Sequence, residues 1–132
     1  MMKSKVSYRK GFAWLLSSCL ILLFCPLAVY GAGVSVSSNC SGCTVITTIT
    51  GNTITGSGGT GVSVNMAGSA TSTVTVTGNT ISGNALGVDI RNNAGPMTLR
   101  MRNNQYSNNG KNYQINGSNI NTSSSIFRIR RR

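Results

Sequence analysis

The sequence predicts an all-β fold: a short, single-stranded parallel β-helix of about three coils, preceded by an N-terminal targeting segment. A heptapeptide recurs after about 25 to 27 residues, short segments alternate apolar with polar side chains, and Gly and Asn mark the turns. A fixed repeat of this length is typical of solenoids, in which each coil packs on the next one along the chain. The alternation with period 2 is that of half-buried strands, and helical periodicity is absent from residues 33–132.

The first 32 residues have the three-part layout of a secretory signal peptide. Basic residues come first, a largely apolar run follows at 12–29, and small residues stand at 31–33. We expect removal of 1–32 near Gly31 or Ala32, which makes the protein secreted, periplasmic or exposed at the cell surface. The alternative is a retained membrane anchor, because about 18 apolar residues can just span a bilayer.

The rest of the chain is an internal repeat over residues 46–118. The segment 50–56 recurs at 77–83 and, in a degraded form, at 102–108. In each copy a second short strand follows, and we interpret the unit as a two-strand coil. Val, Ile and Thr, which favour strands, dominate these segments. Alternation predicts which side chains face inward: Thr47, Ile49, Ile54, Val62, Val64, Val74, Val76, Ile81, Val88, Ile90, Leu99, Met101, Tyr106, Tyr113 and Ile115.

An asparagine occupies the same corner of each copy, at Asn52, Asn79 and Asn104. Successive coils of a parallel solenoid lie roughly 4.8 Å apart, so identical side chains superpose. Asparagine tolerates a left-handed backbone, and its amide can hydrogen-bond its copy in the next coil. We therefore predict an internal asparagine ladder that ties the coils together.

The pattern Val-Thr-Val-Thr-Gly-Asn-Thr-Ile-Ser-Gly-Asn at 74–84, followed by Gly-Val-Asp-Ile at 87–90, resembles a known repeat. It is similar to the right-handed parallel β-helix repeat of pectate-lyase-like and NosD-like proteins, over residues 44–118. The resemblance implies the fold and its right-handedness. It does not imply an activity, since lyases, hydrolases, adhesins and surface proteins share this coil.

The charge balance argues against catalysis. The sequence holds 12 Lys and Arg, one acidic residue and no His, for a formal net charge of +11. General acid–base pairs, nucleophilic triads and metal cages need carboxylates or imidazoles that are missing here. We expect no enzyme activity, no cofactor and no metal site, and we interpret Asp89 as a solvated outward residue paired with Arg91 or with an Arg of the next coil. The alternative is a remnant or subunit of a polysaccharide-active β-helix enzyme.

Cys40 and Cys43 lie in the segment 33–45, which we interpret as an N-terminal cap region. Their Cys-x-x-Cys spacing suits a redox-active pair, half of a zinc site or a local disulfide. A zinc site needs two further ligands, and a thioredoxin-like site needs a βαβ context. A disulfide that closes a loop in an oxidising compartment is therefore the preferred interpretation.

Basic residues gather in the last third of the chain, where eight of them against one acid leave +7 after the targeting segment. We expect them to form one region that attracts an anionic polysaccharide or a cell-envelope glycan, and no nucleic acid. Residues 119–132 are interpreted as a partial coil and a basic tail. The region comprises Arg91, Arg100, Arg102, Arg128, Arg130, Arg131 and Arg132.

The predicted solenoid is short, and its end strands expose unpaired backbone groups unless other segments cover them. We therefore expect self-association through the open ends as a second kind of partnership. Together these features predict an exported, non-enzymatic repeat protein with a structural or binding role, such as glycan binding or adhesion.

Overall fold

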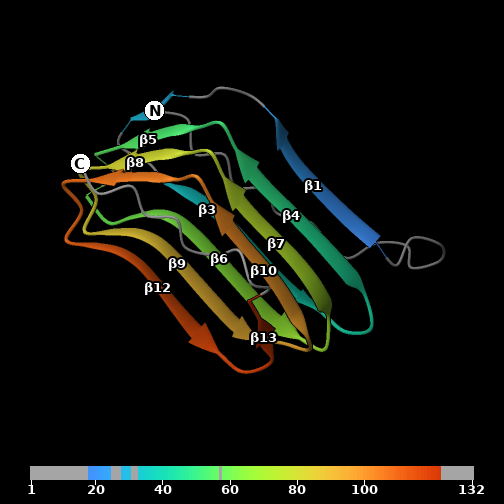
Figure 1. The fold of residues 1–132 in the computed structure, drawn as a ribbon. Helices are drawn as coiled ribbons and strands as arrows, with labels where there is room; N and C mark the ends of the chain where they lie inside the picture. Colours follow the sequence, from blue (N-terminus) through green and yellow to red (C-terminus); the bar gives the residue numbers. More distant parts are fainter. Residues whose placement is uncertain (1–17, 25–27, 31–32, 57, 123–132) are drawn as a thin grey trace.

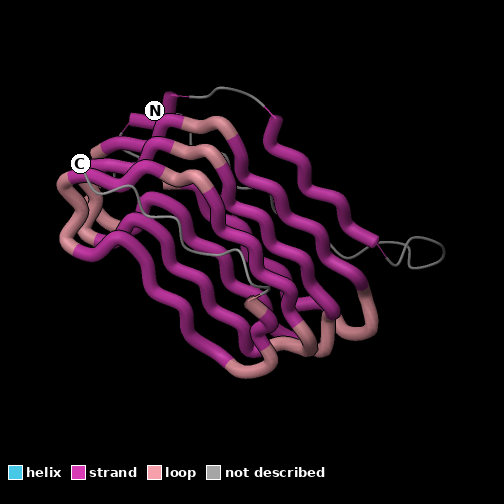
Figure 2. The backbone as a smooth tube through the Cα atoms, viewed as in Figure 1, coloured by secondary structure: helices cyan, strands magenta, loops and turns pink. Residues whose placement is uncertain are grey.

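The computed structural model describes residues 18–24, 28–30, 33–56 and 58–122, with side chains from Gly33 onward. Thirteen strands connected by turns make up this part of the chain, and no helix occurs in it (Figure 2). The strands pair in parallel and form three sheets that wind around one core (Figure 1). The predicted all-β parallel solenoid of about three coils is confirmed.

Sheet A consists, in spatial order, of β1 (Ser18–Phe24), β4 (Thr44–Thr50), β7 (Thr71–Thr77), β10 (Met97–Arg102) and β13 (Ile120–Asn121). Sheet B consists of β2 (Ala28–Tyr30), β5 (Thr53–Thr55), β8 (Thr80–Ser82) and β11 (Gln105–Ser107). Sheet C consists of β3 (Val34–Cys40), β6 (Thr60–Gly68), β9 (Leu86–Asn93) and β12 (Lys111–Gly117). Each complete coil thus contributes one strand to each sheet, so neighbours within a sheet are equivalent segments of successive repeats.

Each coil contains three strands, and the predicted two-strand coil is therefore wrong. The additional strands β5, β8 and β11 are three residues long and follow the asparagine corner directly. A strand this short turns a single side chain inward, such as Ile54 or Ile81, so alternation predicts that side chain but does not separate the strand from the one before the corner.

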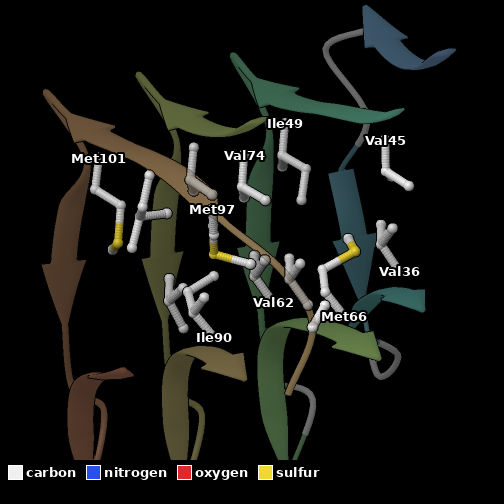
Figure 3. Close-up of a cluster of buried hydrophobic side chains, with 14 of the residues drawn as sticks. Val36, Val45, Ile49, Val62, Met66, Val74, Ile90, Met97 and Met101 are labelled. Carbon is white, nitrogen blue, oxygen red and sulfur yellow. The ribbon is translucent and has the colours of Figure 1, made fainter. Parts of the chain in front are cut away.

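The core lies between the inner faces of the sheets (Figure 3). Side chains of sheet A, such as Ile49 and Val74, meet side chains of sheet C, such as Val62 and Ile90, and all four are fully buried. The predicted inward positions are confirmed in both central coils. In the last coil the inward aromatic ring of Tyr106 is half-buried and lies 6.4 Å from that of Tyr113. Burial of the apolar columns therefore holds the coils together. At the C-terminal end the inward side chains are less well shielded from solvent.

The sheets extend beyond the predicted repeat boundaries on both sides. In the predicted cap region 33–45, β3 pairs with β6, and in the predicted tail region, β13 pairs with the start of β10. Strands β1 and β2 come from the predicted targeting segment, and they pair with β4 and β5. β1 and β2 thus supply two strands of a rung at the N-terminal end. Export and removal of 1–32 stay predictions.

Candidate functional site

The three predicted ladder asparagines form one hydrogen-bonded column at the corner between sheets A and B. Asn79 Oδ1 accepts from the backbone N–H and from Nδ2 of Asn52, at 2.9 and 3.1 Å. The backbone N–H and Nδ2 of Asn79 both donate to Asn104 Oδ1, each at 3.0 Å. Asn79 Nδ2 also donates to the Ile49 carbonyl at 2.9 Å. Asn79 is 0% exposed and uses both amide hydrogens and its amide oxygen, so it is the most heavily bonded member.

The left-handed backbone at this corner belongs to the residue before each ladder asparagine. Gly51 and Gly78 have φ of 68° and 66°, and Asn103 takes that place in the last coil with φ 54°. The sequence-based expectation that the ladder residue itself adopts this conformation is therefore wrong. A residue at positive φ turns the chain so that the next side chain points along the stack, and glycine does this without a steric penalty.

A second ladder, which the sequence-based prediction missed, occupies the corner between sheets B and C. The backbone N–H and Nδ2 of Asn84 donate to Asn109 Oδ1, at 3.0 and 3.1 Å. The residues before them, Gly83 and Asn108, again have positive φ, 67° and 52°. Both corners thus use a left-handed residue followed by Asn. The recurrence of this dipeptide at the repeat spacing is the signal in the sequence that could have identified the second ladder.

A column of glycines opens the strands of sheet C at Gly33, Gly61 and Gly87. A Cβ atom on Gly61 would lie 2.8 Å from the Gly87 carbonyl oxygen, and one on Gly87 would collide with the carbonyl oxygen of Asn112. Backbones of successive coils approach each other so closely here that no larger residue fits. The prediction of strands beginning Gly-Val did not foresee this steric role.

Asp89 lies on the outward face of sheet C, as predicted, but it is not solvated. Its side chain is 4% exposed, and Oδ2 accepts from Arg91 Nε at 2.8 Å. Ser63 and Gln114 stand beside it in the flanking strands, and Oδ1 has no hydrogen-bond partner. The one acidic side chain of the sequence is therefore buried and paired with Arg91, whose side chain remains 58% exposed.

The structure separates the predicted basic residues. Arg100 and Arg102 are exposed on the outward face of β10 in sheet A, in register with Thr75 and Thr77 of β7. Arg91 lies on sheet C, whose outward face points away from that of sheet A because their inner faces meet in the core (Figure 3). The predicted single basic region therefore does not include Arg91. The remaining members, Arg128, Arg130, Arg131 and Arg132, lie outside the described residues.

Cys40 and Cys43 form a disulfide across the turn between β3 and β4, with their Cα atoms 6.0 Å apart. The turn also docks on the next coil, because the backbone N–H of Gly42 donates to the Ser69 hydroxyl at 3.2 Å. The carbonyl of Cys43 accepts from the N–H of Thr71 at 3.0 Å. The disulfide thus fixes the connection through which the chain passes from sheet C to sheet A.

Replacing both cysteines by serine (Cys40→Ser with Cys43→Ser) is expected to lower the free energy of unfolding by about 2 kcal/mol. Chain entropy predicts this value for a loop of only a few residues. Urea denaturation followed by circular dichroism measures the change. As a control, a reducing agent should destabilise the wild type by a similar amount and leave the double variant unaffected. Equal stability of variant and wild type would contradict a structural role for the bond.

The described residues offer little other reactive chemistry. Burial raises the pKa of the Tyr106 hydroxyl to about 12, and the nearby Tyr113 adds to this, whereas a hydrogen bond with Asn104 lowers it. Tyr106 is therefore neutral at physiological pH. No group of three or more His, Cys, Asp and Glu side chains lies together in the described ranges. Nor does this part of the chain hold a helix long and apolar enough to cross a membrane.

Comparisons with protein-family models, with curated proteins and with solved structures found no match to this chain. Its architecture is thus known from its own geometry. Proposals about its role rest on three features: the hydrogen-bonded corners, the basic side chains of sheet A and the ends of the sheets.

Proposed function

We propose that this chain is an exported, non-enzymatic β-helix protein that binds an anionic polysaccharide or cell-envelope glycan at the cell surface or in the periplasm. The proposal includes a kinship with right-handed pectate-lyase-like and NosD-like repeats, which is based on the Gly-Asn-Thr-Ile pattern of residues 74–90. The targeting segment and the disulfide support export, because disulfides persist in oxidising compartments.

The observation that carries the proposal is the pair of arginines on sheet A. Arg100 and Arg102 are two residues apart on one strand and project from the same face, with Thr75 and Thr77 beside them. The guanidinium groups suit carboxylate or sulfate groups, to which they donate paired hydrogen bonds. The neighbouring threonine hydroxyls suit sugar hydroxyl groups. A flat face of this kind fits an extended charged polymer better than a compact ligand.

A binding role without catalysis is favoured by the environment of Asp89. The carboxylate is buried, and Arg91 occupies one of its oxygens. A general acid or base must reach the substrate, and it works with a second titratable group at a suitable distance. The sequence holds no other carboxylate and no imidazole.

Replacing both arginines by threonine (Arg100→Thr with Arg102→Thr) is expected to weaken binding to heparin and alginate about tenfold at low salt, since exposed charge contacts contribute modestly. Threonine continues the columns of Thr75 and Thr77, so the fold should tolerate the change. Isothermal titration at several salt concentrations measures the affinity. The wild-type affinity should fall as salt rises, because exposed ion pairs are screened.

Lys111→Gln is the matched control, because it removes an exposed charge from sheet C and should change the affinity little. A second variant, which lacks residues 128–132, measures the contribution of the basic tail. If only this deletion weakens binding, the ligand contacts the tail and not sheet A. If neither polymer binds the wild type, the proposed function is wrong.

A further inference from the structure

The three sheets do not begin and end at the same level. Sheet A reaches one rung further than the others at the C-terminal end, where β13 pairs with β10 while β11 and β12 are the last described strands of sheets B and C. At the N-terminal end β1, β2 and β3 form one rung together. Only β3 of these three lies beyond the predicted targeting segment.

Removal of residues 1–32, as the proposed export requires, takes away β1 and β2 but leaves β3. The outer edges of β4 and β5 then lose their neighbours, whereas β6 keeps its partner β3. The exported chain thus has two stepped ends. Its N-terminal end has an extra strand in sheet C, and its C-terminal end has an extra strand in sheet A.

The two steps are complementary, and we propose that the exported protein stacks head to tail on a second copy of itself. In this arrangement the two residues of β13 of one copy take the place of the start of β1, beside Val45 and Ile46 of the next copy. At the same level, β3 of the next copy pairs with β12 of the first. The two partial rungs thereby form one shared rung of sheets A and C, and both sheets continue in parallel across the junction, while no described strand takes the place of β2 in sheet B. The inference rests on the proposed export, because β1 and β2 occupy the edges of β4 and β5 until they are removed.

The register of the repeat specifies which residues meet. In sheet C the column Ser37, Asn65, Arg91 and Asn116 is continuous through the four strands. Stacking therefore places Asn116 of one copy directly beside Ser37 of the next, about 4.8 Å away, the spacing of neighbouring strands. Both side chains are exposed and face outward.

Side-chain charge does not oppose this contact. The N-terminal end presents β3 and β4, which carry no charged residue, whereas the C-terminal end carries Arg100, Arg102 and Lys111. Stacking therefore brings no charged side chain of β3 or β4 against these residues, and the charge that cleavage adds is the α-ammonium group of Gly33. Because the two contacting surfaces differ, the association is heterologous and does not close at two copies. The expected product is a rod that lengthens as the protein concentration rises.

Cysteine cross-linking tests the register. The full-length chain with Ser37→Cys and Asn116→Cys is expressed with export, purified and oxidised. Neighbouring strands bring Cα atoms within the range of a disulfide, but the same two residues within one copy are three rungs, roughly 14 Å, apart and cannot link. We expect dimers, trimers and larger covalent species on a non-reducing gel, in at least tenfold excess over the control.

The matched control is Asn65→Cys with Asn116→Cys. These positions are two rungs apart both within a copy and across the proposed junction, which is too far for a disulfide. Both variants keep the Cys40–Cys43 pair, so any background exchange is equal. Sedimentation velocity of the wild type should show a mean mass that rises with concentration.

N-terminal sequencing of the purified protein separates the two ways to fail. If the targeting segment is removed and the protein still sediments as a monomer without specific cross-links, head-to-tail stacking is wrong and export stands. If both cysteine variants cross-link equally, the register is wrong. If residues 1–32 remain on the exported or membrane-bound protein, the proposed processing is wrong, and the vacated site that stacking needs does not arise.

Discussion

Asn79→Ala is expected to lower the free energy of unfolding by about 4 kcal/mol, a large part of the roughly 5 to 15 kcal/mol of a typical domain. The substitution removes the amide that bonds Asn52, Asn104 and the Ile49 carbonyl in a fully buried corner. Each buried polar group that loses its partner costs about 1 to 3 kcal/mol. Urea denaturation monitored by circular dichroism measures the loss.

Two comparisons make the result specific to the ladder. Asn79→Asp keeps the size but turns an amide donor into an acceptor facing two oxygen atoms, so it should destabilise at least as strongly. Asn65→Ala, at an exposed position of β6, should change stability by less than about 0.5 kcal/mol. Asn108→Ala should lower the free energy of unfolding by roughly 1 kcal/mol, because Asn108 has φ 52° and alanine tolerates this left-handed backbone less well. This loss is smaller than that expected for Asn79→Ala. Equal losses of stability at Asn79 and Asn65 would show that the ladder does not stabilise the fold.

Gly87→Ala is expected to destabilise the protein by about 3 kcal/mol, as overpacking of a tightly packed site does. The new methyl group would collide with the Asn112 carbonyl oxygen, so β9 and β12 would have to separate where their backbones are in close contact. Thermal unfolding and the m-value of urea denaturation measure the loss and show whether the last coil still folds with the others.

Gly59→Ala is the control that separates the steric clash from the general effect of replacing glycine by alanine. A Cβ at Gly59 meets no atom within 4 Å, and its φ does not lie in the left-handed region. Alanine there should be neutral, or stabilise by a few tenths of a kcal/mol to about 1 kcal/mol through the unfolded state. A Gly87→Ala protein as stable as the Gly59→Ala protein would show that the coils can move apart at little cost.

The repeat spacing predicted most of the interior, because parallel stacking makes equivalent residues neighbours. Once 50–56 is aligned with 77–83, the column of Ile49 and Val76 and the contact of Asn52 with Asn79 follow without further information. Such features depend on the period alone, and the period is visible in a single sequence.

Other features depend on how the chain bends between strands and on side-chain conformations. The repeat period carries no information about either. Whether Arg91 and Arg100 share a face depends on the bend between β9 and β10, and the two residues lie on different sheets. The burial of Asp89 depends on the conformation of Arg91 above it and on its neighbours in β6 and β12. The second ladder was missed because Ser57, not Asn, occupies the equivalent place in the first copy, so only two copies carry the motif.

Every paired strand in the described residues joins positions 23 to 28 residues apart along the chain, from Met97 with Ile120 to Val34 with Val62. A described coil thus pairs only with the coil before it and the coil after it. Such a molecule behaves like a linear series of coupled units, in which a unit at the end has one neighbour and a central unit has two. Unfolding should therefore start by fraying from the ends. The strands β7, β8 and β9, which all keep neighbours on both sides when residues 1–32 are removed, should exchange their amide hydrogens last.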